Sequence, residues 1–171
     1  MGKINYVVRN TPRLSLQGAR LVMAAATRKA AALRVPMDIA VVDDGGHLIV
    51  FNRMDGAKLS SIDIAISKAW TAACSRRPTH EYAEIAGPGR PAYGIHMTND
   101  GRFTIVGGGL PIRIGNGVLG GIGCSGGTVH QDREVAQSGI VALRSKMTPG
   151  RATRRTVRRA AGKKPKRRKR A

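Results

Sequence analysis

Three side chains that can bind an acid or move a proton lie close together in the least regular part of the chain, residues 79–101. Arg90, Tyr93 and His96 follow the loop sequence Gly87-Pro88-Gly89. An arginine can hold a carboxylate through two parallel hydrogen bonds, and histidine or tyrosine can transfer a proton. With Tyr93 and His96 as catalytic residues, this group suits a cofactor-free isomerase, tautomerase or hydratase of small organic-acid or aromatic catabolism. Ordinary structural loop residues are the alternative.

A glycine pattern that is used for dinucleotides occurs later, as Gly121-Ile-Gly123-Cys-Ser-Gly126. A dinucleotide fold also needs a second parallel strand and an acidic residue about 20 positions further on. No acidic residue follows Glu134, so we expect neither NAD nor FAD and interpret the pattern as a tight strand-to-helix turn. The amides of Ser125, Gly126 and Gly127 remain candidates for holding an anionic ligand group at a helix N-terminus.

The first half of the chain contains signals for a helix and a hairpin. Ser15 is a suitable N-cap for an apolar face that continues until Pro36 stops the helix. Two β-rich runs, 37–43 and 46–53, flank the turn dipeptide Asp44-Gly45. That arrangement predicts a β-hairpin.

The second half alternates helices with short apolar runs. Ser60 and Asp63 form the pattern of a capping box before one helix, and Thr128 and Gln131 form another before the last helix. Three further strands are expected at Phe103–Val106, Leu110–Ile114 and Val118–Cys124. Hairpins in place of crossovers predict an α+β domain, with an antiparallel sheet of about five strands and helices packed on it.

Charge is distributed unevenly along the 171 residues. The chain has 30 basic and 10 acidic side chains, and residues 151–171 hold 12 of the basic ones and no acid. We expect residues 148–171 to form a disordered cationic tail, which can bind nucleic acid without sequence preference or serve only as a solvated extension. The folded domain is assigned to residues 14–147, after an N-terminal segment, 1–13, with a candidate edge strand.

The lengths of the apolar stretches and the positions of the cysteines argue against a membrane protein, a secreted protein and a protein with a cysteine metal site. No apolar run approaches the roughly 18 residues that span a bilayer, and the first 12 residues lack the apolar region of a secretory signal. We therefore expect no membrane partner and a cytoplasmic location. Cys74 and Cys124 are far apart and have no metal-ligand spacing, so both are expected to be buried, reduced thiols.

Five short motifs occur in an order and spacing that resemble the GlcG/HbpS family, which is also similar to the C-terminal domain of PduO-type corrinoid adenosyltransferases. The resemblance covers residues 14–145 and leaves out the tail. It implies a profilin-like or PAS-like fold that assembles into dimers or larger rings. The motifs are Asp43-Asp44-Gly45-Gly46, Arg53-Met54-Asp55-Gly56-Ala57, Ser61-Ile62-Asp63-Ile64-Ala65 with Lys68-Ala69, Gly108-Gly109-Leu110-Pro111-Ile112, and Gly120 to Gly127 with Gln131-Asp132.

The family motifs suggest Arg53, Asp55 and Lys68 as ligand-binding residues. Arg90 of the irregular loop and the Ser125–Gly127 turn complete the candidate set. The alternative is a surface pair of Arg53 with Asp55 and a solvated Lys68. Members of the family include a haem-binding sensor component, so the resemblance implies a protein that binds haem or another anionic organic molecule.

Haem needs an axial ligand and apolar walls. The candidate ligands in this chain are His47, Cys74, His80, His96 and Met54, and the first helix contains no histidine. With only six aromatic residues, a haem slot would have aliphatic walls. The sequence therefore predicts a ligand-binding protein first, an enzyme second, and a polyanion-associated protein third.

Overall fold

The computed structural model describes residues 11–147, and within them the chain forms one antiparallel sheet with the strand order β2-β1-β4-β3. This confirms the expected α+β class. None of the helices in this range is long and apolar enough to cross a membrane. In chain order the elements are α1 (Leu16–Ala32), β1 (Asp38–Asp43), β2 (Leu48–Arg53), α2 (Ser61–Ser75), α3 (Thr79–Ile85), η1 (Ile95–Met97), η2 (Asn99–Gly101), β3 (Gly109–Ile114), β4 (Gly117–Ser125) and α4 (Val129–Met147).

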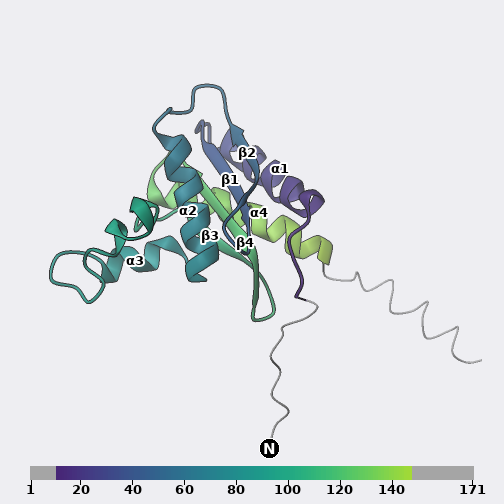
Figure 1. Cartoon of the computed structure of the whole chain (residues 1–171). Helices are drawn as coiled ribbons and strands as arrows, with labels where there is room; N and C mark the ends of the chain where they lie inside the picture. Colours follow the sequence, from purple (N-terminus) through teal and green to yellow (C-terminus); the bar gives the residue numbers. More distant parts are fainter. Residues whose placement is uncertain (1–10, 148–171) are drawn as a thin grey trace, which may run out of the picture.

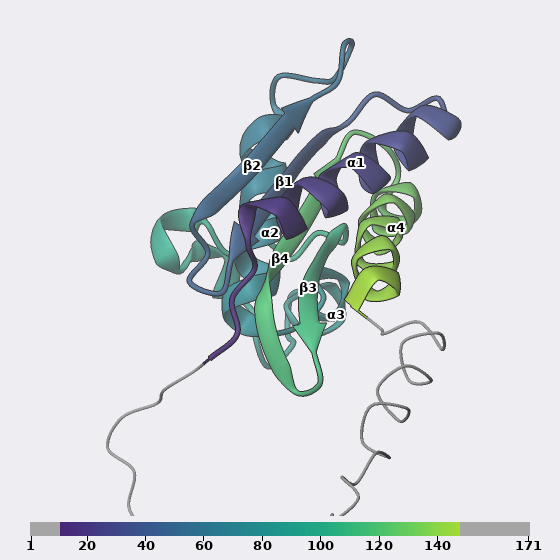
Figure 2. The same cartoon turned by 90° about the vertical axis from the view of Figure 1, so that its right-hand side faces the viewer.

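The sheet is the middle of three layers. Helices α1 and α4 pack side by side on one face, and α2 lies on the other face (Figures 1 and 2). Ile39 and Val41 of β1 point into the core under α1 and α4, whereas Ala40 and Val42 pack against α2. This alternation follows from the two-residue period of a strand that is buried on both faces.

Helix α2 lies unusually close to the sheet. A Cβ atom at Gly121 or Gly123 of β4 would collide with the backbone oxygens of Ala69 and Ala65. Gly109 of β3 faces the backbone of Lys68 in the same way. The glycine pattern of β4 therefore has a packing role, because only residues without a side chain allow this approach.

Local signals at three turns are confirmed. The Ser15 hydroxyl accepts a hydrogen bond from the amide of Gly18 at 3.1 Å and caps α1. At the start of α4, Thr128 N donates to Gln131 Oε1 at 2.9 Å and Gln131 N donates to Thr128 Oγ1 at 3.3 Å. The expected hairpin forms between β1 and β2, with residues 38–42 paired to residues 48–53.

Other expectations are corrected. The sheet has four strands within the described range, because the run Phe103–Val106 is irregular. The Phe103 ring instead packs edge-on against Tyr82 of α3, with ring centres 4.8 Å apart, and the amide of Thr104 donates to the Thr71 side chain at 3.0 Å. Tertiary contacts thus replace strand pairing, and α3 forms where only irregular chain was expected.

The capping box expected at Ser60 is wrong, because no side chain of that residue caps α2. Cys124 is buried as expected, but Cys74 is exposed. The sheet-facing positions at that end of α2 are taken by Ala69 and Ala73, and Cys74 stands one position beyond them. The candidate strand before residue 11 and the cationic tail lie outside the described residues.

Candidate functional site

The predicted site residues separate into two groups. Arg53 and Ser125 lie at the same end of the sheet, where β2 and β4 end and β1 begins. Arg90, Tyr93 and His96 lie in the long connection from α3 to β3, where the first two are exposed. Within residues 11–147 the structure records no hydrogen bond or ion pair between the two groups.

A carboxylate that belongs to none of the sequence motifs lies at this end of the sheet. Asp38 opposes Arg53 of β2 on one side and Ser125 of β4 on the other. It has no exposed surface, and neither of its carboxylate oxygens has a hydrogen-bond partner in the described structure. Burial raises the pKa of Asp38, and the opposite charge of Arg53 acts against that shift. The sequence could have indicated this residue, because Asp38 is an acid at the start of an otherwise apolar strand.

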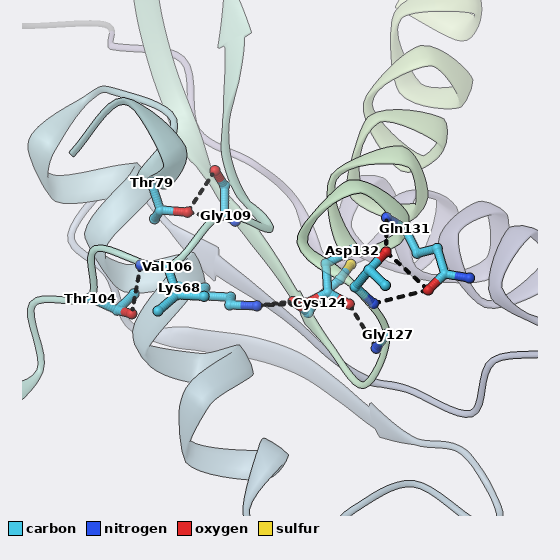
Figure 3. A network of polar contacts seen from close by, with 10 residues as sticks. Lys68, Thr79, Thr104, Val106, Gly109, Cys124, Gly127, Gln131 and Asp132 are labelled. Carbon is cyan, nitrogen blue, oxygen red and sulfur yellow. Dashed lines mark hydrogen bonds and ion pairs between the residues drawn. The ribbon is translucent and has the colours of Figure 1, made fainter. Parts of the chain in front are cut away.

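Lys68 is buried and is not a solvated side chain. Its Nζ atom lies 2.7 Å from Oδ2 of Asp132 and 2.9 Å from the backbone oxygen of Cys124, as Figure 3 shows. Burial raises the pKa of Asp132 despite the ammonium beside it. Gly108 allows this contact, since a Cβ there would lie 2.9 Å from Nζ. Lys68 therefore joins α2 to α4 beneath the candidate ligand turn.

The turn itself uses some of its amides internally. Gly127 N donates to Asp132 Oδ1 at 3.0 Å (Figure 3), and Thr128 N donates to Gln131 Oε1 at 2.9 Å. These two donors already have acceptors, so a ligand at Ser125 or Gly126 would have to find other partners. Asp55, the remaining candidate at this end, is exposed and forms no ion pair with Arg53 in the described range.

A hollow of about 590 Å³ lies between the starts of α3 and α4. Its lining includes His80 of α3, His130 and Arg133 of α4, and Leu110 of β3. Gly107 lies between the two helices, since a Cβ there would be 3.0 Å from Cβ of His80 and 3.7 Å from Cδ of Arg133. Two imidazoles and a guanidinium from distant parts of the chain thus share one surface.

His80 is half-buried, and its Nδ1 atom is buried without a hydrogen-bond partner in the described structure. Burial, followed by the positive charge of Arg133, lowers the pKa of His80. The ring is therefore held in its neutral form, in which imidazole can ligate a metal.

His96 lines a smaller hollow of about 340 Å³ on the outer side of α2. Ile64, Phe103 and Val106 give it apolar walls, and Asp63 is a charged residue of its lining. The Nδ1 atom of His96 is also buried without a partner in the described chain. No hydrogen bond joins its ring to Tyr93 there, so the structure does not assemble these residues as an acid–base pair.

The other candidate haem ligands occupy unsuitable places. His47 is exposed beside the hairpin turn, with Nδ1 3.3 Å from Asp43. Cys74 is exposed, but partial desolvation by its neighbours and the negative charge of Asp43 raise the pKa of its thiol, which disfavours the thiolate that binds iron. Met54 packs against the core under α1. In the described residues no cluster of three or more histidine, cysteine or acidic side chains could hold a bare metal ion.

Known proteins resemble this chain over most of its described length. A 15.0 kDa protein of the dhaT-dhaS intergenic region of Citrobacter freundii is 42% identical over 127 residues, which cover 74% of this chain and 89% of that protein. GlcG of Escherichia coli K12 is 36% identical over 112 residues, 66% of this chain and 81% of GlcG. The corrinoid adenosyltransferase PduO of Salmonella typhimurium is 36% identical over 130 residues, 76% of this chain but 39% of PduO.

Solved structures agree with this relationship. The Klebsiella pneumoniae protein ORFY has a TM-score of 0.80 at 37% identity, over 83% of this chain and 97% of that one. The PduOC:heme complex has a TM-score of 0.74 at 36% identity, over 77% and 95%. The model of the family described as haem degrading protein HbpS-like matches residues 14–141. This chain is therefore a member of the HbpS-like family, as its motifs suggested.

Proposed function

We propose that this protein binds haem, or a similar planar organic anion, in the hollow between α3 and α4. The observation that carries the proposal is that His80, His130 and Arg133 line one hollow together with the apolar side chain of Leu110. Its volume of about 590 Å³ falls within the usual range of small-ligand pockets.

The donor set fits haem in three respects. The imidazole of His80 is kept neutral, and because its Nδ1 atom is buried, Nε2 is the nitrogen that would bind the iron. Arg133 offers a guanidinium for a propionate, and Leu110 contributes an apolar side chain to the lining. Haem would supply a redox-active iron there. The protein's contribution is to orient an imidazole, hold the carboxylates of the ligand and limit access of solvent.

The comparisons support the ligand class. The family is described as haem degrading protein HbpS-like. The PduOC domain, which is 36% identical to this chain, was crystallised as a complex with haem. The His96 hollow is the second candidate place. Its walls are largely apolar, and none of the residues that line it is a lysine or an arginine that could hold a propionate. A carboxylate lines each hollow, Asp63 here and Glu134 beside His80, but Glu134 is paired with Lys29 at 2.6 Å.

An absorption titration with haemin tests this proposal. The full-length protein should develop a Soret band that saturates with haemin. His80→Ala and Arg133→Gln should each weaken binding by about tenfold or more, because each removes a ligand or a charge-assisted hydrogen bond. His47→Ala is the matched control, since His47 is exposed on the opposite hairpin.

His96→Ala decides between the two hollows. A changed spectrum in His96→Ala with an unchanged spectrum in His80→Ala would move the site to the outer side of α2. No saturable Soret change in the wild-type protein would overturn haem binding altogether. Turnover of an organic acid that is lost in His96→Ala would instead favour the enzyme alternative.

A further inference from the structure

Asp38 is a fully buried acid whose charge no described hydrogen bond satisfies. It begins β1 on the same strand face as Ala40 and Val42, which pack against α2. Its relative exposure is 0%, and both carboxylate oxygens are without a partner in the described structure. A buried carboxylate without donors costs several times the free energy of an ordinary hydrogen bond, and such groups are rare in native proteins. Asp38 therefore needs a hydrogen-bond donor, and a bound ligand can provide it.

Three strands place a cation and a hydroxyl beside this carboxylate. Arg53 and Ser125 oppose Asp38 directly in the antiparallel pairing, so all three side chains stand on the same face. Directly opposed residues have Cβ atoms about 4.5–5.5 Å apart. Arg53 is exposed and Ser125 is 5% exposed, which gives the row a charged outer end and a closed inner end.

Helix α2 begins above this row. Ala69 lies over Gly121 and Ala65 lies over Gly123. Four residues of a helix advance about 6 Å and two residues of a strand about 6.8 Å. Extending this series by one step places Ser61 over Ser125, and Ser61 is only 4% exposed.

The first turn of α2 thus faces the carboxylate row. That turn has no side-chain cap, and its acidic residue, Asp63, lines the hollow of His96 on the outer side of the helix. The amides at a helix N-terminus attract negative charge. An acceptor without a donor, Asp38, therefore lies beside two groups that prefer an anion, Arg53 and the start of α2.

We propose that this end of the sheet binds a small carboxylic acid that carries a hydroxyl or ammonium group on the carbon next to its carboxylate. The carboxylate is held by Arg53 and the first turn of α2. The neighbouring hydroxyl or ammonium donates to Asp38, and the hydroxyls of Ser61 and Ser125 line the cavity formed around it.

Because Asp38 has no exposed surface, the proposal requires a movement that opens its side chain to the ligand, and the adjoining segment is the connection 54–60, which follows Arg53. Asp55, Gly56 and Lys58 in this connection are exposed. The site is separate from the hollow of His80 and independent of haem.

A comparison of near-isosteric acids tests the proposal on the full-length wild-type protein. Lactate, alanine and propionate share a three-carbon skeleton, and propionate lacks the second polar group. Isothermal titration should give at least one of lactate and alanine an affinity about tenfold or more above that of propionate, since a buried acceptor left without a donor penalises the analogue. The order of lactate and alanine identifies whether the donor is a hydroxyl or an ammonium.

Equal affinities for propionate and the two other acids would overturn the proposal, as would failure of all three to bind. Asp38→Val should abolish the preference over propionate, and Arg53→Gln should weaken every acid by about tenfold. The controls are Asp100→Asn and Arg28→Gln, which change exposed charges elsewhere. If Asp38→Val does not fold, the preference over propionate in the wild type and in Asp38→Asn still tests the proposal. Haemin titration of Asp38→Val should match the wild type, which separates this site from the haem proposal.

Discussion

The Nζ atom of Lys68 and the Oδ2 atom of Asp132 lie 2.7 Å apart, and their contact joins α2 to α4 around the end of β4. The relative exposures of the two residues are 1% and 3%. The same carboxylate accepts from Gly127 N, and the same ammonium donates to the backbone oxygen of Cys124. Two helices that cover opposite faces of the sheet are therefore fixed to one turn.

Lys68→Met should destabilise the protein by about 3–5 kcal/mol, because it leaves the Asp132 carboxylate buried without its cation. Urea unfolding measures this change. Lys29→Met is the matched control: its pair with Glu134 is 2.6 Å long but partly exposed, so its loss should cost about 1 kcal/mol or less. The double variant Lys68→Met/Asp132→Leu should recover much of the loss. Equal effects of the two single variants would contradict a buried role for Lys68.

Gly123→Ala tests the close approach of α2. The new methyl group would collide with the backbone oxygen of Ala65, and a backbone cannot rotate away as a flexible side chain can. We expect a loss of about 1–3 kcal/mol. Gly87→Ala has only the Arg90 side chain at 3.9 Å and should change stability by about 0.5 kcal/mol or less. Comparable thermal midpoints for the two variants would be inconsistent with the packing described.

Features of the fold that depend on neighbours in sequence could be predicted. The Ser15 cap and the Thr128–Gln131 pair form within one helical turn, and the β1–β2 hairpin needs only a short turn. The run Phe103–Val106 was expected to be a strand, but the Phe103 ring packs against Tyr82 of α3 and the run pairs with no strand of the described sheet. Contacts between distant residues decided that segment.

In the candidate site, too, single residues could be predicted, whereas contacts between distant residues could not. Arg53 and Ser125 were identified from motifs, but their alignment with Asp38 depends on the register of three strands. The shared surface of His80 and Arg133 depends on the backbone at Gly107. No spacing in the sequence reveals that these residues meet, because α3 and α4 are separated by two strands along the chain.

The ionisation of Asp38 should make stability depend on pH. Because its pKa is raised in the folded protein, the folded state binds the Asp38 proton more tightly than the unfolded state does. This contribution to the free energy of unfolding is complete at low pH and is lost as pH rises to the folded pKa. The stability of the wild type relative to Asp38→Asn should therefore fall as pH rises above about 4, the ordinary pKa of an aspartate, and become constant above the folded pKa. Urea melts across this range measure the difference, and Asp132, which also titrates, is common to both proteins. A constant difference would contradict the shifted pKa.

Residues 151–171 should give weak binding to DNA or RNA without sequence preference. Their 12 basic side chains can release counterions from phosphates, so affinity should fall steeply with salt. Fluorescence anisotropy with two unrelated oligonucleotides measures this. A variant with the tail replaced by glycine and serine should lose the binding. Affinity that hardly changes between low and moderate salt would exclude the electrostatic explanation.

The full-length chain should form an oligomer through the adjoining ends of α1 and α4. Leu16 and Met147 are exposed there, and their neighbours Gln17 and Lys146 line one shallow hollow. Exposed apolar groups gathered in this way are typical of contacts between subunits. Light scattering should give a mass above the 18.2 kDa of one chain, and Leu16→Glu/Met147→Glu should return it to that value. Leu59→Glu, which changes an exposed leucine elsewhere, should leave the assembly intact. A wild-type mass of one chain across micromolar concentrations would show that these residues do not join subunits.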